Sequence, residues 1–235
     1  MIDGMHFVPQ SRPRVFFIAF RGDQLIPTSL IAEGPQASWH PAALIEAYSG
    51  IPATTKRNWI WWRISAPLAR NSTFADLIED APTAVKWHAA AHTNYILGLM
   101  SPLNRKKVAD AIASDRRMVG AVYRRTRPDE NGIKRQRAEV RFDDVAGCLR
   151  TPAGGSSRQI ILVVEGKTVR SRLLSPREAA RLMGLDDDYR LPERYNHAYH
   201  VCGDGVCVPV VRHIAQHVLE PALGDHERSE LIAAE

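Results

Sequence analysis

The chain has 235 residues, of which 45% are hydrophobic and 24% are charged. This balance excludes a disordered tail and is enough for one large or two small packed domains. The longest apolar runs, about six or seven residues, are far shorter than the roughly 20 that a membrane-spanning helix needs, and we expect no secretory leader. Three cysteines are too few, and an odd number, for a disulfide framework. We therefore expect a cytoplasmic protein.

Positive charge is concentrated in the middle of the chain. The net charge is +5, but residues 105–141 alone carry twelve Lys and Arg against five Asp and Glu. Most of these cations are arginines, whose planar guanidinium pairs with phosphate groups and with guanine edges. The segment indicates a surface for nucleic acid, and on charge alone a solvated basic face is an equally weighted alternative.

A continuous apolar run lies near the start of the chain. Residues 15–20 are all apolar and are bounded by Pro13 and Gly22. Such a run predicts a strand that is buried on both faces of a sheet. Few residues precede it, so its neighbouring strands must come from later in this chain or from another chain. Residues 35–82 predict irregular structure with a short helix over 42–48.

The basic segment predicts two helices followed by a hairpin. Residues 85–100 and 103–114 have helix-compatible spacing, and residues 119–123 and 137–142 form two strand-like runs around an Asn-Gly turn. A two-stranded ribbon fits the width of a DNA major groove, although it also serves as an ordinary edge hairpin. Its arms carry seven basic residues: Arg124, Arg125, Arg127, Lys134, Arg135, Arg137 and Arg141.

A loop of small residues follows, over residues 148–158. Its Gly154-Gly155 pair lets backbone approach a ligand closely, and Arg150 and Arg158 stand at its shoulders. The loop lacks the Lys-Ser/Thr ending of a phosphate-binding loop. The apolar run 160–164 then predicts a strand that ends in a turn.

Two further helices are predicted in the last third of the chain. Ser175 is a capping residue, Pro176 fits the first helical position, and Glu178 can reach back to the cap. Gly184 predicts the end of that helix. A last helix follows Gly203-Asp204-Gly205, with an apolar stripe made of Cys207, Val211, Ile214, Ala215 and Val218.

Neither a metal site nor a nucleophile is evident. Zinc-binding atoms occur in His197, His200, Cys202, Cys207, His213 and His217. Structural zinc prefers closely spaced cysteine pairs, so we expect no metal here. None of the three cysteines has an obvious His or Glu partner, and no G-x-S-x-G elbow occurs.

Three separated segments resemble motifs of the DNA (cytosine-5)-methyltransferases, in the order and with the spacing of that family. Residues 10–14, Gln-Ser-Arg-Pro-Arg, resemble its Gln-x-Arg-x-Arg motif VIII. Residues 172–184, with the run Ser-Pro-Arg-Glu-Ala-Ala-Arg-Leu-Met-Gly, resemble motif IX. Residues 198–211 resemble motif X, although the chain has Gly-Asp-Gly-Val where the family usually has Gly-Asn-Ser/Ala-Val.

The resemblance implies an α/β fold class. The chain would combine an incomplete remnant of an S-adenosylmethionine-dependent methyltransferase sheet with a mixed α+β target recognition domain. It implies the motif VIII strand of the catalytic domain over 1–21, the target recognition domain over 22–165, the motif IX and X helices over 166–221 and a tail over 222–235.

Site residues follow from the same resemblance. Arg12 and Arg14 would be the catalytic residues, with Arg14 contacting the flipped target cytosine and Arg12 holding the neighbouring geometry or a phosphate. Motif IX, through Arg172, Glu178 and Arg181, would mainly support the recognition domain. The cofactor-binding residues would be Gly203, Asp204, Gly205 and Val206. The DNA-binding residues would be Arg124, Arg125, Arg127, Lys134, Arg135, Arg150, Thr151, Gly154, Gly155, Ser156, Ser157 and Arg158.

The resemblance also predicts what the chain needs from elsewhere. The family's cofactor-binding motif I, the Pro-Cys motif IV with the nucleophile and motif VI are not found in this sequence. The predicted function is the recognition part of a DNA (cytosine-5)-methyltransferase, acting on double-stranded DNA with S-adenosylmethionine and with a separate N-terminal half. A restriction partner is implied by family association. The alternative is a stand-alone DNA-binding module, or a decayed fragment, without catalysis.

Overall fold

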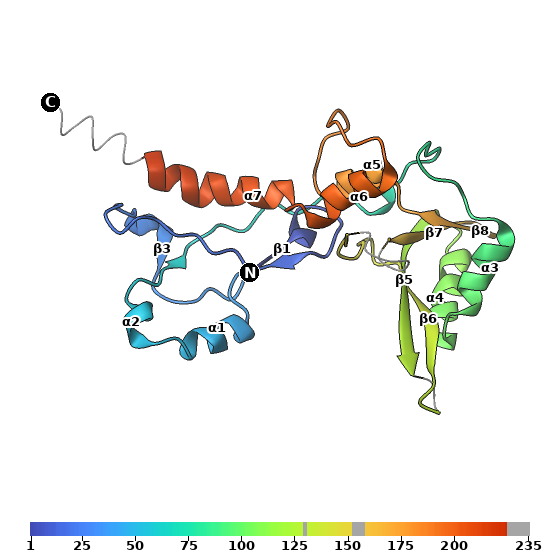
Figure 1. The fold of residues 1–235 in the computed structure, drawn as a ribbon, viewed down its shortest axis with the longest axis horizontal. Coiled ribbons are helices and arrows are strands. Elements are labelled where there is room, and N and C mark those ends of the chain that lie inside the picture. The colour runs from blue at the N-terminus through green and yellow to red at the C-terminus, as the bar shows by residue number, and fades with distance from the viewer. Residues whose placement is uncertain (129–130, 152–157, 225–235) are drawn as a thin grey trace. The chain divides into compact units, whose positions relative to one another are not determined.

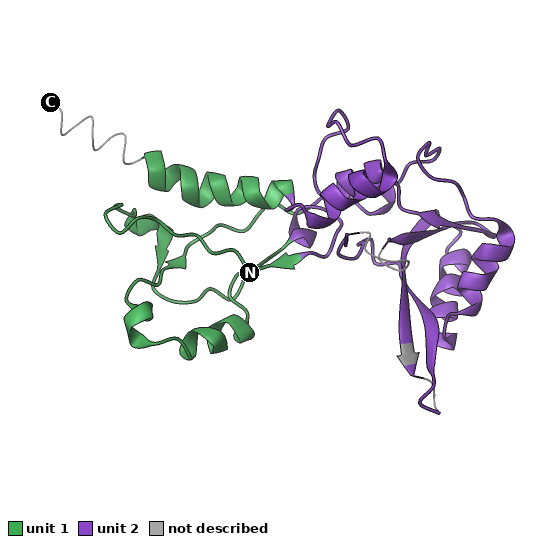
Figure 2. Ribbon diagram, in the orientation of Figure 1, with its two compact units in different colours: residues 1–3, 13–69, 208–235 green, residues 4–12, 70–207 purple. Residues whose placement is uncertain are grey.

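The computed structural model describes residues 1–128, 131–151 and 158–224. The chain separates into two compact units that interleave along the sequence (Figure 2). Unit 1 contains residues 1–3, 13–69 and the described residues from 208 onward. Unit 2 contains residues 4–12 and the described residues of 70–207. The sequence-based division at residues 21 and 165 stays a prediction.

Unit 2 is built on an antiparallel four-stranded sheet (Figure 1). The strand order is β6-β5-β7-β8, so β7 pairs with β5 and not with β6, which precedes it in the sequence and forms one edge of the sheet. The strands are β5 (Met118–Pro128), β6 (Lys134–Arg141), β7 (Ile160–Glu165) and β8 (Thr168–Leu173). The hairpin over the basic segment and the strand over 160–164 are as the sequence predicted.

Helices cover both faces of this sheet. Strand β7 is apolar along almost its whole length, so its side chains on each face need such a cover. One face packs on α3 (Ala90–Gly98) and α4 (Pro102–Ala113), where Ile96, Met100 and Val108 meet Val140. The other face packs on α5 (Pro176–Leu182) and α6 (Tyr195–Asp204), in a core that also contains the 3-10 helix η3 (Ala75–Leu77) at its margin. A short 3-10 helix, η1 (Gly4–His6), also belongs to unit 2.

Helix α5 begins and ends as its sequence predicts. The Ser175 side chain accepts a hydrogen bond from the Glu178 backbone N–H, and the Glu178 carboxylate accepts one from the Ser175 backbone N–H. At the other end Gly184 has a φ of +75°, which only glycine adopts without strain. The Gly184 and Leu185 N–H groups donate to the Arg181 and Ala180 carbonyls, which closes the helix.

Unit 1 has less regular structure. The two-residue strands pair as β1 with β2 and β3 with β4. Its core gathers Trp39, Trp61, Leu30 and Ile214, and the Trp39 indole N–H donates to the Ile64 carbonyl. Its elements are β1 (Ile2–Asp3), β2 (Pro13–Arg14), η2 (Thr28–Leu30), β3 (Ile31–Ala32), α1 (Ala42–Ser49), α2 (Ala53–Lys56), β4 (Trp61–Trp62), α7 (Val208–Ile214) and the π-helix η4 (Ala215–Leu219).

One expectation about secondary structure is wrong. Residues 15–20 do not form the predicted buried strand: β2 ends at Arg14, and Val15 and Phe17 are 46% and 79% exposed. No described residue offers this segment a continuing ladder of backbone hydrogen bonds, without which an apolar run is not a strand. The last helix, α7, follows residues 203–205 as expected, and those residues also end α6, a helix that the sequence did not predict.

No helix among the described residues is both long enough and apolar enough to span a membrane.

Candidate functional site

The site in unit 2 starts from a buried glutamine. Gln10 is fully buried, and its amide nitrogen donates to the Leu182 carbonyl at the end of α5 over 2.7 Å. Its amide oxygen accepts from the Leu149 N–H over 3.1 Å. Backbone hydrogen bonds flank this contact, because Ser11 N–H donates to the Ala146 carbonyl and Ala146 N–H to the Pro9 carbonyl. Residues 9–11 are thereby fixed along residues 146–149.

Arg12 extends the same junction to the end of α6. It is only 4% exposed, and one guanidinium nitrogen, Nη2, donates to the carbonyls of Gly203 and Gly205 over 2.8 and 2.7 Å. The other, Nη1, donates to the Leu149 carbonyl over 3.1 Å and lies 3.5 Å from the Cys148 sulfur. A cation that donates to the last carbonyls of a helix also complements the negative end of the helix dipole. Arg12 therefore joins residues 148–149 to the C-terminus of α6.

Gly203 is required by this packing. A Cβ at this position would lie 2.7 Å from the backbone carbon of Arg150 and from the Thr151 nitrogen. That distance is shorter than real Cβ contacts allow, so α6 approaches residues 150–151 closely only because residue 203 is a glycine.

The other predicted cofactor residues differ in exposure. The Gly205 carbonyl is bound to Arg12. Val206 is 50% exposed, and the Asp204 carboxylate, also largely exposed, lies 2.7 Å from the imidazole Nε2 of His200. Asp204 and Val206 are thus the two side chains that fit contact with a small ligand, since a carboxylate accepts hydrogen bonds from hydroxyl or ammonium groups and Val206 offers apolar surface.

Arg14, the second predicted catalytic residue, belongs to unit 1. It is exposed, and its Nη1 donates to the neighbouring Pro13 carbonyl over 2.8 Å. The two arginines of this short segment therefore have different environments, one buried and used by the fold, the other exposed.

The predicted recognition loop is described only at its shoulders. Arg150 is exposed and Thr151 half-buried. At the other shoulder the Arg158 guanidinium lies over the Tyr195 ring, 5.7 Å from its centroid, and donates to the Asn196 side-chain oxygen over 2.7 Å. The remaining predicted contacts of this loop, Gly154, Gly155, Ser156 and Ser157, lie outside the described residues.

The predicted contacts of the hairpin are spread along its two strands. Arg125 is exposed, lies 5.8 Å from the Tyr123 ring centroid and has Glu139 at 3.7 Å. Arg124 is half-buried, and Lys134 and Arg135 are exposed. Arg127 lies opposite Arg135 in the strand register, and its side chain is outside the described part of the structure.

Two of the three cysteines are buried. Cys202 is buried, and burial raises the pKa of its thiol to about 11. Cys207 is 3% exposed, and Cys148 is half-buried beside Arg12. A nucleophilic cysteine needs a lowered pKa and access to its substrate, which neither Cys202 nor Cys207 combines.

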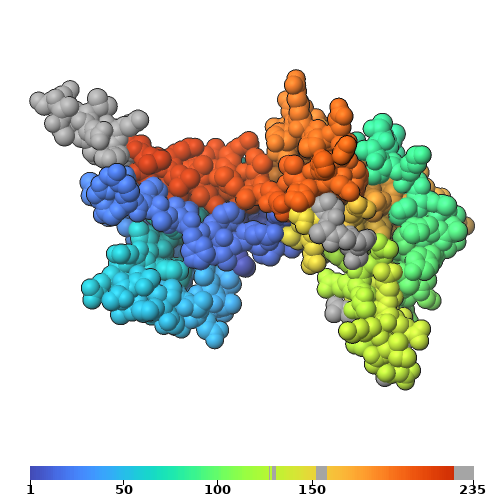
Figure 3. Space-filling model, viewed as in Figure 1, coloured from blue at the N-terminus to red at the C-terminus, as the bar shows by residue number. Residues whose placement is uncertain are grey.

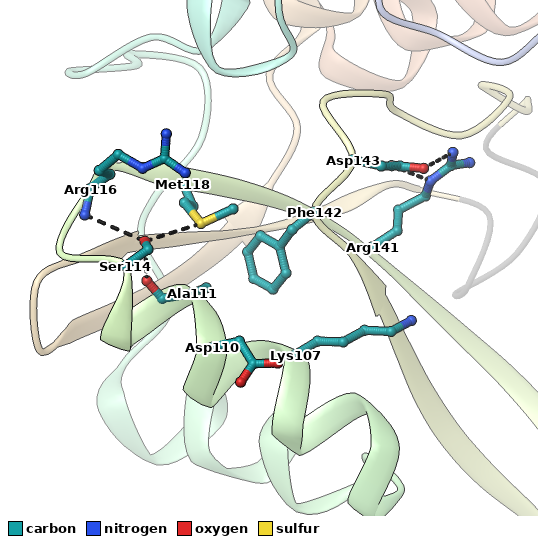
Figure 4. Close-up of a pocket in the computed structure, with 9 residues that line it drawn as sticks. All are labelled: Lys107, Asp110, Ala111, Ser114, Arg116, Met118, Arg141, Phe142 and Asp143. Carbon is teal, nitrogen blue, oxygen red and sulfur yellow. Dashed lines mark hydrogen bonds and ion pairs between the residues drawn. The ribbon is translucent and has the colours of Figure 1, made fainter.

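Two other candidate features lie outside this junction. Across residues 1–128, 131–151 and 158–224 no group of three or more His, Cys, Asp or Glu side chains is placed to hold a metal ion. An open pocket of about 460 Å³ lies between α4, the start of β5 and the end of β6 (Figure 4). Met118 lies beside Ser114 on one side of Phe142, and the paired Arg141 and Asp143 lie on the other. The pocket contains none of the residues assigned from the sequence.

The sequence assigned no role to two residues of this site, Gln10 and Tyr199. The Tyr199 hydroxyl accepts the Gln159 N–H over 3.0 Å just after the recognition loop, and burial raises its pKa to about 12. Both residues stand within the quoted motifs, so the motif was the available signal. The spacing of the motif alone does not predict that the Gln10 amide bridges the end of α5 and Leu149.

Comparison with known proteins identifies the family to which these residues belong. The sequence profile of the C-5 cytosine-specific DNA methylases matches residues 5–220, which include Gln10, Arg12, the hairpin, the recognition loop and α6. The chain belongs to this family. Membership of this family explains why the segments that meet at Arg12, although far apart in the sequence, resemble methylase motifs.

Curated methylases match a shorter stretch of the chain. The type II methyltransferase M.NlaX of Neisseria lactamica is 41% identical over 58 residues, which is 25% of this chain and 18% of that protein. M1.ScrFI of Lactococcus lactis subsp. cremoris is 37% identical over 59 residues, and M.SsoII of Shigella sonnei 36% over 58, each covering 25% of this chain and 15% of the relative. The matched stretch thus spans less than a fifth of the length of these methyltransferases.

Proposed function

We propose that this chain is the DNA-recognition part of a cytosine-5 methyltransferase, which transfers a methyl group from S-adenosylmethionine to carbon 5 of cytosine in a duplex site. The observation that carries this proposal is the position of Arg12. Its guanidinium joins Leu149, beside the predicted recognition loop, to Gly203 and Gly205 in the predicted cofactor segment. A loop that contacts DNA would in this way be held in fixed register with the segment that contacts the methyl donor.

The division of labour between the two arginines follows from their burial. Arg12 donates from both terminal guanidinium nitrogens to protein carbonyls, so we assign it to positioning and not to contact with a base. Arg14 is exposed, and its planar fork suits hydrogen bonding to the oxygen and nitrogen of an extrahelical cytosine. Arg14 is therefore the proposed contact to the target base.

S-adenosylmethionine supplies an electrophilic methyl group, and two residues of this chain fit its binding. Asp204 would accept a hydrogen bond from a hydroxyl or ammonium group of the cofactor, and Val206 would give apolar contact. Gly203 and Gly205 would act through the backbone, since one packs against residues 150–151 and the other is held by Arg12.

We further propose that an N-terminal methyltransferase half, as a separate chain, supplies the nucleophile. Addition of a thiolate to the cytosine ring needs a reactive cysteine. The raised pKa of Cys202 and the burial of Cys207 do not support that role for them. The exposed Val15 and Phe17 support a protein partner for unit 1, because large apolar side chains that gather in one segment are typical of interaction sites.

Co-purification of the two halves tests this proposal. Phe17→Asp should abolish co-elution of this chain with a separately expressed N-terminal half, because it puts a charge into the apolar contact. Leu68→Asp, at a residue that is 94% exposed in the same unit, is the matched control and should co-elute like the wild type. Equal co-elution of both variants would overturn the assignment of this contact, and no co-elution of the wild type would overturn the separate half.

A further inference from the structure

The hairpin β5–β6 extends beyond the sheet to which it belongs (Figure 1). Strand β7 pairs with β5 only over residues 118–122, whereas β6 pairs with β5 over residues 121–128. Residues 123–128 and 134–139 thus form a two-stranded ribbon, and among the described residues no third strand pairs with its β5 side. The ribbon projects from the rest of unit 2 in the space-filling view (Figure 3), and its two faces have different neighbours.

The strand register places arginines directly opposite each other. Arg125 pairs with Arg137, and Arg127 pairs with Arg135, two residues further along the ribbon. Residues directly opposite on antiparallel strands share a face, with Cβ atoms about 5 Å apart, and like charges at this spacing are destabilising. Arg125 and Arg137 are thus like charges on one face, and Arg135, two residues from Arg137, lies on the same face. A polyanion bound to this face would relieve the repulsion.

The face that carries Arg125 and Arg137 is the one on which residues 145–149 pack. Tyr123 and Glu139 lie on it, as the contacts of Arg125 with both side chains show. The Tyr123 ring fills the space that a Cβ at Gly147 would need, with its hydroxyl 2.1 Å from that position. Residues 145–149, which lead into the loop, therefore pack on the same face.

The opposite face of the ribbon belongs to the helices. Ala138 and Val140 are buried there against α3 and α4. Arg124, which pairs with Ala138, is close enough to His88 to contribute to the lowering of its pKa, after burial and His92. Lys134 is an even number of residues from Ala138 and so lies on this second face.

We propose that Arg125, Arg135 and Arg137 form a phosphate-binding face for duplex DNA on the side of the ribbon where residues 145–149 pack, and that Arg124 and Lys134 lie outside it. This inference rests on the proposed function and narrows it, since it keeps two of the predicted basic contacts of the hairpin, Arg125 and Arg135, and adds Arg137. Glu139 is the acidic side chain next to Arg125, and the face keeps a surplus of positive charge over it. Three guanidinium groups on one face fit a row of phosphates on one strand, and they would position the duplex without reading its sequence.

Two double variants with the same loss of charge test the face. Arg125→Gln/Arg137→Gln changes the proposed face, and Arg124→Gln/Lys134→Gln is the matched control on the other. Binding of a mixed-sequence duplex is measured by fluorescence anisotropy between 50 and 300 mM salt, with the N-terminal half present. We expect the first variant to lower the slope of log affinity against log salt by about 2 and the affinity by about 10- to 100-fold, and the control to change affinity by no more than about 3-fold. Thermal unfolding of all three proteins checks that each is folded.

Each other outcome is decisive. Equal losses in both variants would overturn the face assignment in favour of a general electrostatic effect, and unchanged binding in the first variant would overturn it while leaving the proposed function intact. A wild-type protein that binds a single-stranded RNA as tightly as the duplex would overturn the duplex as the ligand. A wild type that binds no DNA and supports no methyl transfer would overturn both the inference and the proposed function.

Discussion

Arg172 and Glu178 form an ion pair in which both side chains are completely buried. The pair is bidentate, with Nη2–Oε1 at 2.6 Å and Nη1–Oε2 at 2.8 Å. Glu178 also accepts backbone N–H groups of Glu79 and Ser175, and the Arg172 guanidinium lies 4.8 Å from the Trp87 ring centroid. Strand β8, helix α5 and residue 79 are thereby joined around two charges whose hydrogen bonds lie within the protein.

Removal of one partner of this pair should be strongly destabilising. Glu178→Gln leaves a buried guanidinium without its counter-charge, so we expect the free energy of unfolding to fall by about 3–5 kcal/mol. Urea unfolding followed by circular dichroism measures this. The double variant Arg172→Met/Glu178→Leu removes both charges and should lose less stability than Glu178→Gln. A larger loss in the double variant would contradict this prediction, because it would show that the ion pair stabilises the protein more than apolar side chains do in its place.

The junction at Arg12 leads to a second prediction. Arg12→Ala leaves the carbonyls of Leu149, Gly203 and Gly205 without their buried donor, and we expect unit 2 to lose about 3 kcal/mol of stability. Hydrogen exchange should be faster at residues 146–151 and at the end of α6 than elsewhere. Arg14→Ala changes an exposed side chain and should alter stability by less than about 0.5 kcal/mol. Similar losses in both variants would contradict the separation of roles.

A pair of glycine substitutions tests the close approach at the end of α6. Gly203→Ala places a methyl group against the Arg150–Thr151 backbone, and we expect a loss of about 2 kcal/mol or more. Gly98, the last residue of α3, has no atom within 4 Å of its added Cβ, so Gly98→Ala should raise stability by up to about 1 kcal/mol. Thermal unfolding of both variants measures the difference. A stabilising Gly203→Ala would show that residues 150–151 do not pack there.

Stability should fall on mild acidification. Burial, followed by electrostatic interaction with His92 and Arg124, lowers the pKa of His88 below its usual value of about 6.5. The unfolded chain then takes up a proton more readily than the folded chain, so stability is present above about pH 6.5 and is lost as the pH falls from there toward the lowered pKa. Urea unfolding at pH 7.5 and 5.5 checks this.

His88→Gln should weaken that pH dependence, and the exposed His197→Gln is its control. Burial also lowers the pKa of His40 and His213 in unit 1, so some dependence should remain in the His88 variant. Stability that is equal at the two pH values, or greater at pH 5.5, would contradict the assignment.

Much of unit 2 was predictable because its signals are local. Two features of α5 depend only on residues close in the sequence: the capping box of Ser175 and Glu178, and the turn at Gly184. Both are present as expected. The hairpin was equally evident from its Asn-Gly step and its flanking strand-like runs. Such short-range signals do not depend on which other segments pack nearby.

The site was predictable only in part, because its contacts join distant segments. The motif marks Gln10 and Arg12, but nothing local shows that Arg12 donates to residues almost 200 positions away, and the sequence assigned it to catalysis. Residues 15–20 show the opposite error, since an apolar run was read as a buried strand without a partner on which to pair. The face of the hairpin that carries Arg137 emerged only from the strand register.

Methyl transfer by reconstituted halves tests the central claim most directly. Tritiated methyl transfer from S-adenosylmethionine to mixed-sequence duplex DNA is measured with this chain alone, with a separately expressed N-terminal methyltransferase half alone, and with both. The account predicts incorporation only when both are present, and loss of that incorporation with Arg14→Ala. Incorporation by this chain alone, or none by the mixture, would contradict it.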